Sequence, residues 1–86
     1  MPARVYFDDK LLLSTQENDI TLDDVFTNDD GSRWAVLSPK KLFLSNGATV
    51  DNPIAATVQK QNKRLIIRWM ILAGDSKTLE LCSYTL

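Results

Sequence analysis

Short apolar segments alternate with turn signals along the whole chain, and this spacing limits the fold more than any other feature. Each of the three glycines, Gly31, Gly47 and Gly74, stands next to Asn, Asp or Ser. Glycine accepts positive φ, and Asn and Asp side chains bond the nearby backbone, so such neighbours favour tight turns. The segments between the turns are mostly too short for stable helices and are rich in β-branched and aromatic residues. The pattern predicts a mainly β chain.

The clearest single feature is the pair Asn46-Gly47 between two apolar segments. This pair favours a type I′ turn, whose twist matches that of paired strands. Pro53 lies shortly after the second segment and ends the ladder there, because proline has no amide donor. Together with the other turn signals, these features predict strands over 5–7, 11–13, 33–37, 41–45, 48–50, 54–59, 64–72 and 79–86.

One segment, 21–26, is compatible with a helical turn, although it is too short to stand alone and an extended conformation is nearly as favoured. Thr21 is a suitable N-cap, and Asp23 and Asp24 suit the positive first turn of a helix. The 86 residues support one domain with a single core and no linker. We therefore expect a single all-β domain over 1–86: an antiparallel β-barrel or β-sandwich of six to eight short strands, with at most one short helical turn near residues 21–26.

The longest strand, 64–72, is apolar on both faces. Side chains alternate along a strand, so one face carries Leu65, Ile67, Trp69 and Ile71, and the other carries Ile66, Arg68, Met70 and Leu72. If the first face fills the core, the second needs cover. That cover comes either from the amino-terminal hairpin or from another molecule, for which a homodimer is the simplest source. Ile66 and Met70 are thus candidate partner-binding residues.

The composition excludes most catalytic chemistry. The chain has no histidine and a single cysteine, Cys82, so triads with histidine, disulfides within the chain and zinc sites of several thiolates are all excluded. Its glycines form no phosphate-binding loop. Three adjacent acid pairs could hold a cation, but neighbouring residues on a strand point to opposite faces. We expect no enzyme, no cofactor and no metal site. The three pairs are Asp8-Asp9, Asp23-Asp24 and Asp29-Asp30.

The net charge is −1, but its distribution is uneven. Residues 5–30 carry eight acids and one base, whereas residues 31–86 carry eight bases and three acids. One interpretation is that the acids simply occupy solvated turns. The other is an acidic patch that docks on a basic-surfaced partner, with partner-binding residues Asp23, Asp24, Asp29 and Asp30.

These features predict a small, non-enzymatic protein–protein interaction module: an inhibitor, an adaptor or an assembly component. The alternative is a nucleic-acid-binding barrel of the oligonucleotide-binding or Sm-like kind, but Trp69 lies on the face opposite Arg68, and the pI of about 5.2 argues against strong phosphate binding. The basic residues of that alternative are Lys60, Lys63, Arg64 and Arg68. In size and build, though in no motif, the chain resembles small phage-encoded inhibitors, head–tail joining components and immunity proteins.

The sequence also predicts a soluble, cytoplasmic protein. Its longest nearly apolar run, 65–73, has nine residues and contains Arg68, which is about half of what a membrane helix needs. The first nine residues reach Asp8 and Asp9 before any apolar signal core. We expect neither membrane insertion nor secretion.

Overall fold

The computed structural model describes residues 3–17, 20–75 and 77–86. Within these ranges the chain forms nine β-strands and one short 3-10 helix. The elements are β1 (Ala3–Phe7), β2 (Lys10–Thr15), the 3-10 helix η1 (Leu22–Asp24), β3 (Val25–Thr27), β4 (Trp34–Leu37), β5 (Lys41–Leu44), β6 (Thr49–Asp51), β7 (Ile54–Gln61), β8 (Arg64–Leu72) and β9 (Leu79–Thr85).

The strands form three antiparallel sheets, and every strand pairs only with its neighbours in sequence. The amino-terminal hairpin is β1–β2, the middle sheet is β3–β4–β5–β6 and the carboxy-terminal sheet is β7–β8–β9. Tight turns with a positive φ join several pairs, at Asp8 (φ 52°) and Asn62 (φ 58°) among them. Asp and Asn tolerate this left-handed conformation better than most residues do.

The turn between β5 and β6 differs from the predicted type I′ turn. That type needs positive φ at both central residues, but only Gly47 has one, at 89°, and Asn46 does not. Gly47 N–H bonds Leu44 C=O, and Leu44 N–H bonds Ala48 C=O. This is a three-residue loop that ends in a glycine bulge, another common hairpin connection. The Asn46 side chain is used instead to accept the Ala48 N–H at 2.9 Å.

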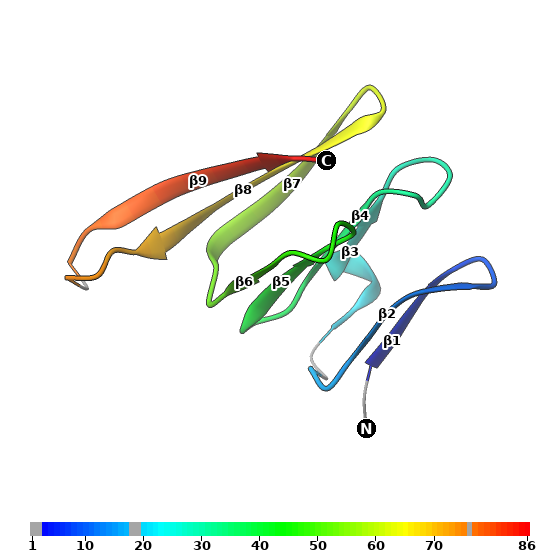
Figure 1. Cartoon of the computed structure of the whole chain (residues 1–86), viewed down its shortest axis with the longest axis horizontal. Coiled ribbons are helices and arrows are strands. Elements are labelled where there is room, and N and C mark those ends of the chain that lie inside the picture. Colours follow the sequence, from blue (N-terminus) through cyan, green and yellow to red (C-terminus); the bar gives the residue numbers. More distant parts are fainter. Residues whose placement is uncertain (1–2, 18–19, 76) are drawn as a thin grey trace.

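The three sheets stack in chain order, with the middle sheet between the other two (Figure 1). On one side, small and branched side chains of β4 and β5 meet the inner face of β8. This main core comprises Ala35, Leu42, Leu44, Leu65, Ile67 and Trp69, all 8% exposed or less. The middle sheet is therefore in contact with the carboxy-terminal sheet along its central strands.

On its other side, the middle sheet packs against the amino-terminal hairpin. Val36 and Phe43 pack with Val5 of β1, and Leu12 and Leu13 of β2 add partly buried contacts. The central strands β4 and β5 are consequently covered on both faces. Because the hairpin lies on this side, it does not cover the outer face of β8.

The structure confirms the mainly β class and the helical turn near residues 21–26, where η1 forms. Two finer expectations need correction. The described residues hold nine strands rather than six to eight, because the segment after η1 pairs as a further strand, β3. The barrel is wrong: across the described ranges no sheet closes on itself, since the strands divide into three sheets of two, four and three strands.

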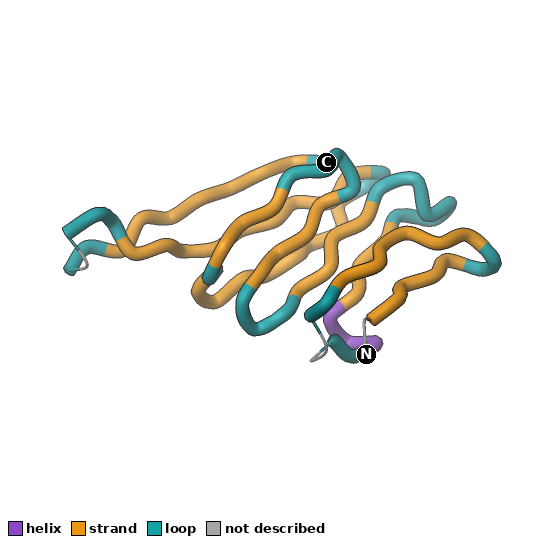
Figure 2. Tube along the Cα trace, turned by 60° about the horizontal axis from the view of Figure 1, so that its bottom comes forward, coloured by secondary structure: helices purple, strands orange, loops and turns teal. Residues whose placement is uncertain are grey.

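The β8–β9 hairpin projects beyond the other strands (Figure 2). The strand β7 begins at Ile54, which pairs with Met70, so the last residues of β8 extend past it and pair only with β9. The molecule has a radius of gyration of 13.2 Å and extents of 44 × 35 × 20 Å. A compact chain of this length has a radius of gyration of about 12 Å.

Candidate functional site

The outer face of the carboxy-terminal sheet carries the largest gathering of exposed apolar side chains. Residues directly opposite each other in paired strands share a face. Met70 pairs with Ile54 of β7 and Leu81 of β9, and Leu72 pairs with Leu79. With Ile66 further along β8, these residues form what we call the outer apolar face: Ile54, Ile66, Met70, Leu72, Leu79 and Leu81.

Three leucines dominate this face. Leu72, Leu79 and Leu81 are 54%, 53% and 75% exposed, whereas Ile66 and Met70 on the central strand are half-buried by their neighbours. Leu72 and Leu79 pair with each other on the part of the β8–β9 hairpin that projects past β7, and Leu81 lies beside them, opposite Met70. Isolated exposed leucines are ordinary, but a contiguous apolar face rimmed by polar residues marks an interaction surface.

The charge on the same face is positive. Arg64 and Arg68 both lie on it, and the Arg68 guanidinium donates to Gln59 Oε1 across the strand pair at 3.2 Å. Among residues 54–61, 64–72 and 79–85 the one carboxylate is Glu80, which pairs with Ile71 and so belongs to the inner face. The outer face therefore combines apolar side chains with two guanidinium groups.

The acidic candidate residues lie elsewhere, at the two ends of the short edge strand β3. Asp23 and Asp24 are in η1, before β3. The Asp24 carboxylate accepts the backbone N–H of Thr21 at 2.9 Å and its hydroxyl at 3.0 Å, so this side chain stabilises the start of η1. Asp23 is exposed to solvent.

Asp29 and Asp30 lie in the β3–β4 turn. The Asp29 carboxylate forms an ion pair with the Lys60 ammonium of β7, which joins the middle and carboxy-terminal sheets. Asp30 accepts the Ser32 N–H at 2.9 Å, and hydrogen bonding from Ser32 lowers the pKa of the exposed Asp30 carboxyl below its ordinary value. Three of the four acids thus have bonding partners within the chain, and none shares a surface with Ile66 and Met70.

The basic residues of the nucleic-acid alternative are divided as well. Arg64 and Arg68 are on the outer face, Lys60 pairs with Leu65 and so belongs to the inner face, and Lys63 is in the β7–β8 turn beside Asp29 and Asp30. Trp69 is only 8% exposed and belongs to the core, which removes it as a base-stacking platform.

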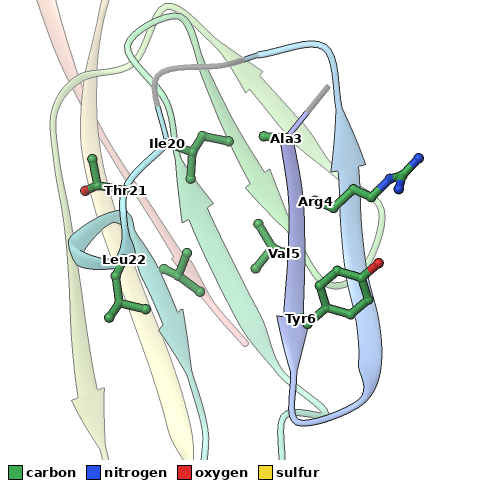
Figure 3. A pocket seen from close by; sticks show the side chains of 8 residues that line it. Ala3, Arg4, Val5, Tyr6, Ile20, Thr21 and Leu22 are labelled. Atoms are coloured by element: carbon green, nitrogen blue, oxygen red, sulfur yellow. The ribbon is translucent and has the colours of Figure 1, made fainter. Parts of the chain in front are cut away.

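A separate cavity of about 230 Å³ lies between β1 and the segment that leads into η1. Val5 and Ile20 point into this space, while Arg4 and Tyr6 extend to the other side of β1 (Figure 3). Typical small-molecule sites measure about 300–1,000 Å³ and hold several convergent polar groups. This cavity is smaller, and its walls are mostly apolar: Ala3, Val5, Ile20, Leu22 and Val25.

Other chemistry finds little support in the part of the chain that the structure describes. There, no three acidic or cysteine side chains come together in the manner of a metal-ligand set. Cys82 is half-buried on the inner face of β9, with its sulfur 4.0 Å from the Glu80 carbonyl oxygen. The described residues also include no helix of the length and apolarity required to cross a membrane.

Sequence reasoning missed half of the outer apolar face. It singled out Ile66 and Met70 on β8 but not the more exposed leucines of β9. The alternation Leu79, Leu81, Ser83 was visible in the sequence, but only the register with β8 shows that these leucines extend the face of Met70 and Leu72.

No protein-family model, curated protein or solved structure matches this chain.

Proposed function

We propose that the chain is a non-enzymatic protein–protein interaction module, acting as an inhibitor, adaptor or assembly component, and that it binds its partner with the outer apolar face. The observation that carries this proposal is the cluster of three exposed leucines on that face. Leu72, Leu79 and Leu81 are half or more exposed and lie side by side on paired strands. Their exposure costs the isolated molecule hydrophobic stabilisation, at about 25 cal/mol per Å² left in water, and a partner would recover it.

The chemistry of the face also indicates the chemistry of the partner. Apolar side chains call for a complementary apolar patch, and Arg64 at one end of the face and Arg68 between Ile66 and Met70 call for carboxylates opposite them. Arginine is enriched at protein interfaces because its planar guanidinium binds carboxylates with two parallel hydrogen bonds. The partner of this face thus combines an apolar patch with carboxylates that meet the two arginines. A basic-surfaced partner for the acidic residues around β3 stays a separate prediction.

The test is affinity capture from a lysate of the encoding cells, with the full chain immobilised and with nuclease added in a parallel arm. The double variant Met70→Ser, Leu72→Ser removes two apolar side chains from the outer face. The matched control is Leu22→Ser, because Leu22 is 88% exposed on η1 and lies outside that face. We expect the double variant to lose the captured protein and the control to retain it, with both variants folded by circular dichroism.

Three outcomes contradict the proposal. Undiminished capture by the double variant would remove the outer face from the interaction. Loss of capture on reversing Asp23, Asp24, Asp29 and Asp30 to lysine, with the outer face intact and the fold preserved, would transfer the interaction to the acidic residues. Capture of nucleic acid alone, weakened when Arg64 and Arg68 are neutralised, would favour the nucleic-acid alternative.

A further inference from the structure

Edge strands expose unpaired backbone groups, and proteins usually hinder further pairing there. Three edges of the two larger sheets carry such a hindrance. The strands β3 and β6 have only three residues each, and β6 runs directly into Asn52-Pro53. The strand β7 has an irregular register after Ile54, with Ala55 at φ 52°, and it carries Lys60.

The edge strand β9 has none of these features. It is seven residues long, its register with β8 is unbroken, and it contains neither proline nor lysine. Its single charged residue is Glu80. A long, regular and largely uncharged edge is a template for one more strand.

The hydrogen bonds to β8 show which backbone groups of β9 point outward. Leu65 and Leu86 exchange both of their backbone bonds, at 3.1 and 2.8 Å. In an antiparallel ladder, bonded and non-bonded pairs alternate. Ala73 N–H bonds Thr78 C=O in the same phase. The even-numbered residues of β9 therefore bond β8, and the outward N–H and C=O groups belong to Leu79, Leu81, Ser83 and Thr85.

We propose that a second copy of this chain pairs with β9 in the antiparallel sense, about a two-fold axis at Cys82, so that two three-stranded sheets become one of six strands. This goes beyond the proposed function, because it uses the edge of the sheet rather than its outer face. In this register Leu81 is opposite Ser83 of the second copy, and Leu79 is opposite Thr85. Two such pairs on each side of the axis exchange about eight backbone hydrogen bonds, within the range of about 10 ± 5 for a typical interface.

Neighbouring registers are poorer. A shift of two residues in either direction loses one bonded pair and leaves about six bonds. A shift of one residue places outward groups against groups that already bond β8, and it would join the outer face of one copy to the inner face of the other. The central register is thus the one that the hydrogen-bonding pattern of β9 favours.

The side chains also suit this register. Leu81, the most exposed residue of the outer apolar face, becomes a diagonal neighbour of Leu81 in the second copy, at about 7–8 Å. The two outer apolar faces then become continuous across the axis. Glu80 is opposite Tyr84 of the second copy, and the two Glu80 residues are four positions apart along the strand direction, about 13 Å, so like charges do not meet.

The interface is small, since a seven-residue strand is only about 23 Å long. Interfaces below about 1,200 Å² are weak and transient. We therefore expect the dimer to form at high protein concentration and to dissociate on dilution.

The experiment combines sedimentation velocity over a concentration series with oxidative cross-linking. The proposed axis places Cys82 directly opposite Cys82 of the second copy in a non-bonded pair, with Cα atoms about 4.5 Å apart, which is within disulfide range. Because Cys82 is the only cysteine, any disulfide-linked dimer joins these two residues. We expect dimer on sedimentation at high concentration, and a cross-linked dimer after treatment with copper phenanthroline.

Two variants block the edge without touching the core. Ser83→Pro removes an outward N–H, and Leu81→Lys places two ammonium groups near the axis. Both are expected to be monomeric and to lose the cross-link, and Leu81→Lys keeps the test decisive if the proline variant fails to fold. The collision control is Cys82→Ser, Leu11→Cys, whose thiol is on the exposed face of β2. It should dimerise on sedimentation without cross-linking.

A monomer at every concentration would overturn the proposal, as would undiminished dimer in Leu81→Lys or equal cross-linking in the Leu11→Cys control. The double variant Met70→Ser, Leu72→Ser leaves the edge intact and is expected to dimerise normally. Failure of partner capture and failure of dimerisation are therefore separate results.

Discussion

The middle sheet and the carboxy-terminal sheet contain similar strands but meet different surroundings. The central strands β4 and β5 of the middle sheet place Ala35, Leu42 and Leu44 against one layer and Val36 and Phe43 against the other. The central strand β8 of the carboxy-terminal sheet buries its inner face equally well, but its outer face meets solvent.

This difference shows that apolar residues on both faces of a strand can arise for two distinct reasons. In β4 and β5 the chain's own layers use both faces, as in an interior sheet. In β8 the inner face serves the fold, with Leu65, Ile67 and Trp69 buried in the main core and Ile71 packed against it. On the other side, Ile66 and Met70 are half-buried and Leu72 is exposed, so this face has no covering layer from the described residues.

The largest expected effect separates these two roles directly. Leu42 is fully buried, so Leu42→Ala leaves a cavity in the main core and should lower the free energy of unfolding by about 2–5 kcal/mol. The matched change Leu81→Ala removes the same atoms from the outer apolar face and should alter stability by no more than about 0.5 kcal/mol. Urea unfolding of both variants measures the difference. Equal losses would mean that the two faces are not distinct.

A second test addresses the layer on the other side of the middle sheet. A Cβ at Gly31 would lie 2.5 Å from the Phe7 ring of β1, and Gly31 has φ 76°. Gly31→Ala should therefore lower stability by about 1–3 kcal/mol through overpacking and backbone strain.

Gly47→Ala is the control for backbone strain, because Gly47 has φ 89° but a Cβ added there would meet no atom within 4 Å. It should cost about 1 kcal/mol from the positive φ alone. Thermal unfolding of the two variants isolates the contact between the hairpin and the middle sheet. Equal melting temperatures would show that this contact is loose.

A third test asks whether the projecting hairpin behaves as surface. Leu72→Ser should leave the free energy of unfolding within about 0.5 kcal/mol of the parent, because Leu72 is half exposed. Leu65→Ala on the same strand should cost about 2–5 kcal/mol. Guanidinium unfolding can compare the pair. A large loss from Leu72→Ser would place the outer face within the fold's own core.

The smallest expected effect is on the pH dependence of stability. The test compares one turn of the middle sheet with one turn of the carboxy-terminal sheet. Backbone hydrogen bonds from Lys77 and Thr78 lower the pKa of Asp75, much as bonds from Ser32 lower that of Asp30. A carboxyl with a lowered pKa in the folded state stabilises the fold above its unfolded pKa, and this contribution is lost as pH falls through the folded pKa. Both groups should titrate below the ordinary aspartate range in NMR.

Asp30→Asn and Asp75→Asn should each make stability slightly less sensitive to acid. Both side chains are exposed, so the changes are small. A group that titrates at or above the ordinary range would indicate that its turn is open in solution.

Much of the fold was predictable because turn chemistry is local. The turns at Asn28–Gly31 and after Asn46, the break at Pro53 and the three carboxy-terminal strands all follow from short-range rules. The stacking of layers was not predictable in the same way. Nothing in the sequence of β1 and β2 specifies whether this hairpin covers β8 or β5. Both strands offer an apolar surface, and only the tertiary arrangement of the sheets determines which one the hairpin packs on.

The candidate site was only partly predictable for the same reason. The alternation around Arg68 identified Ile66 and Met70, but the outer apolar face takes half of its members from β7 and β9 through the strand register. For the acidic residues, the sequence pattern suggested a single patch. Their clustering in the sequence was clear, yet β3 separates them into two groups, and three of them bond neighbouring groups.

The pairing of every strand with its sequence neighbours has a consequence for how the chain reaches this fold. No strand must wait for a distant part of the chain, so each ladder closes only a short loop and loses little chain entropy. Folding rates rise as contacts become more local. The hairpin and the middle sheet can form in turn as the chain leaves the ribosome, and the carboxy-terminal sheet can then add to a surface already in place. A β protein of this design should fold faster than one of equal length in which the first and last strands must meet.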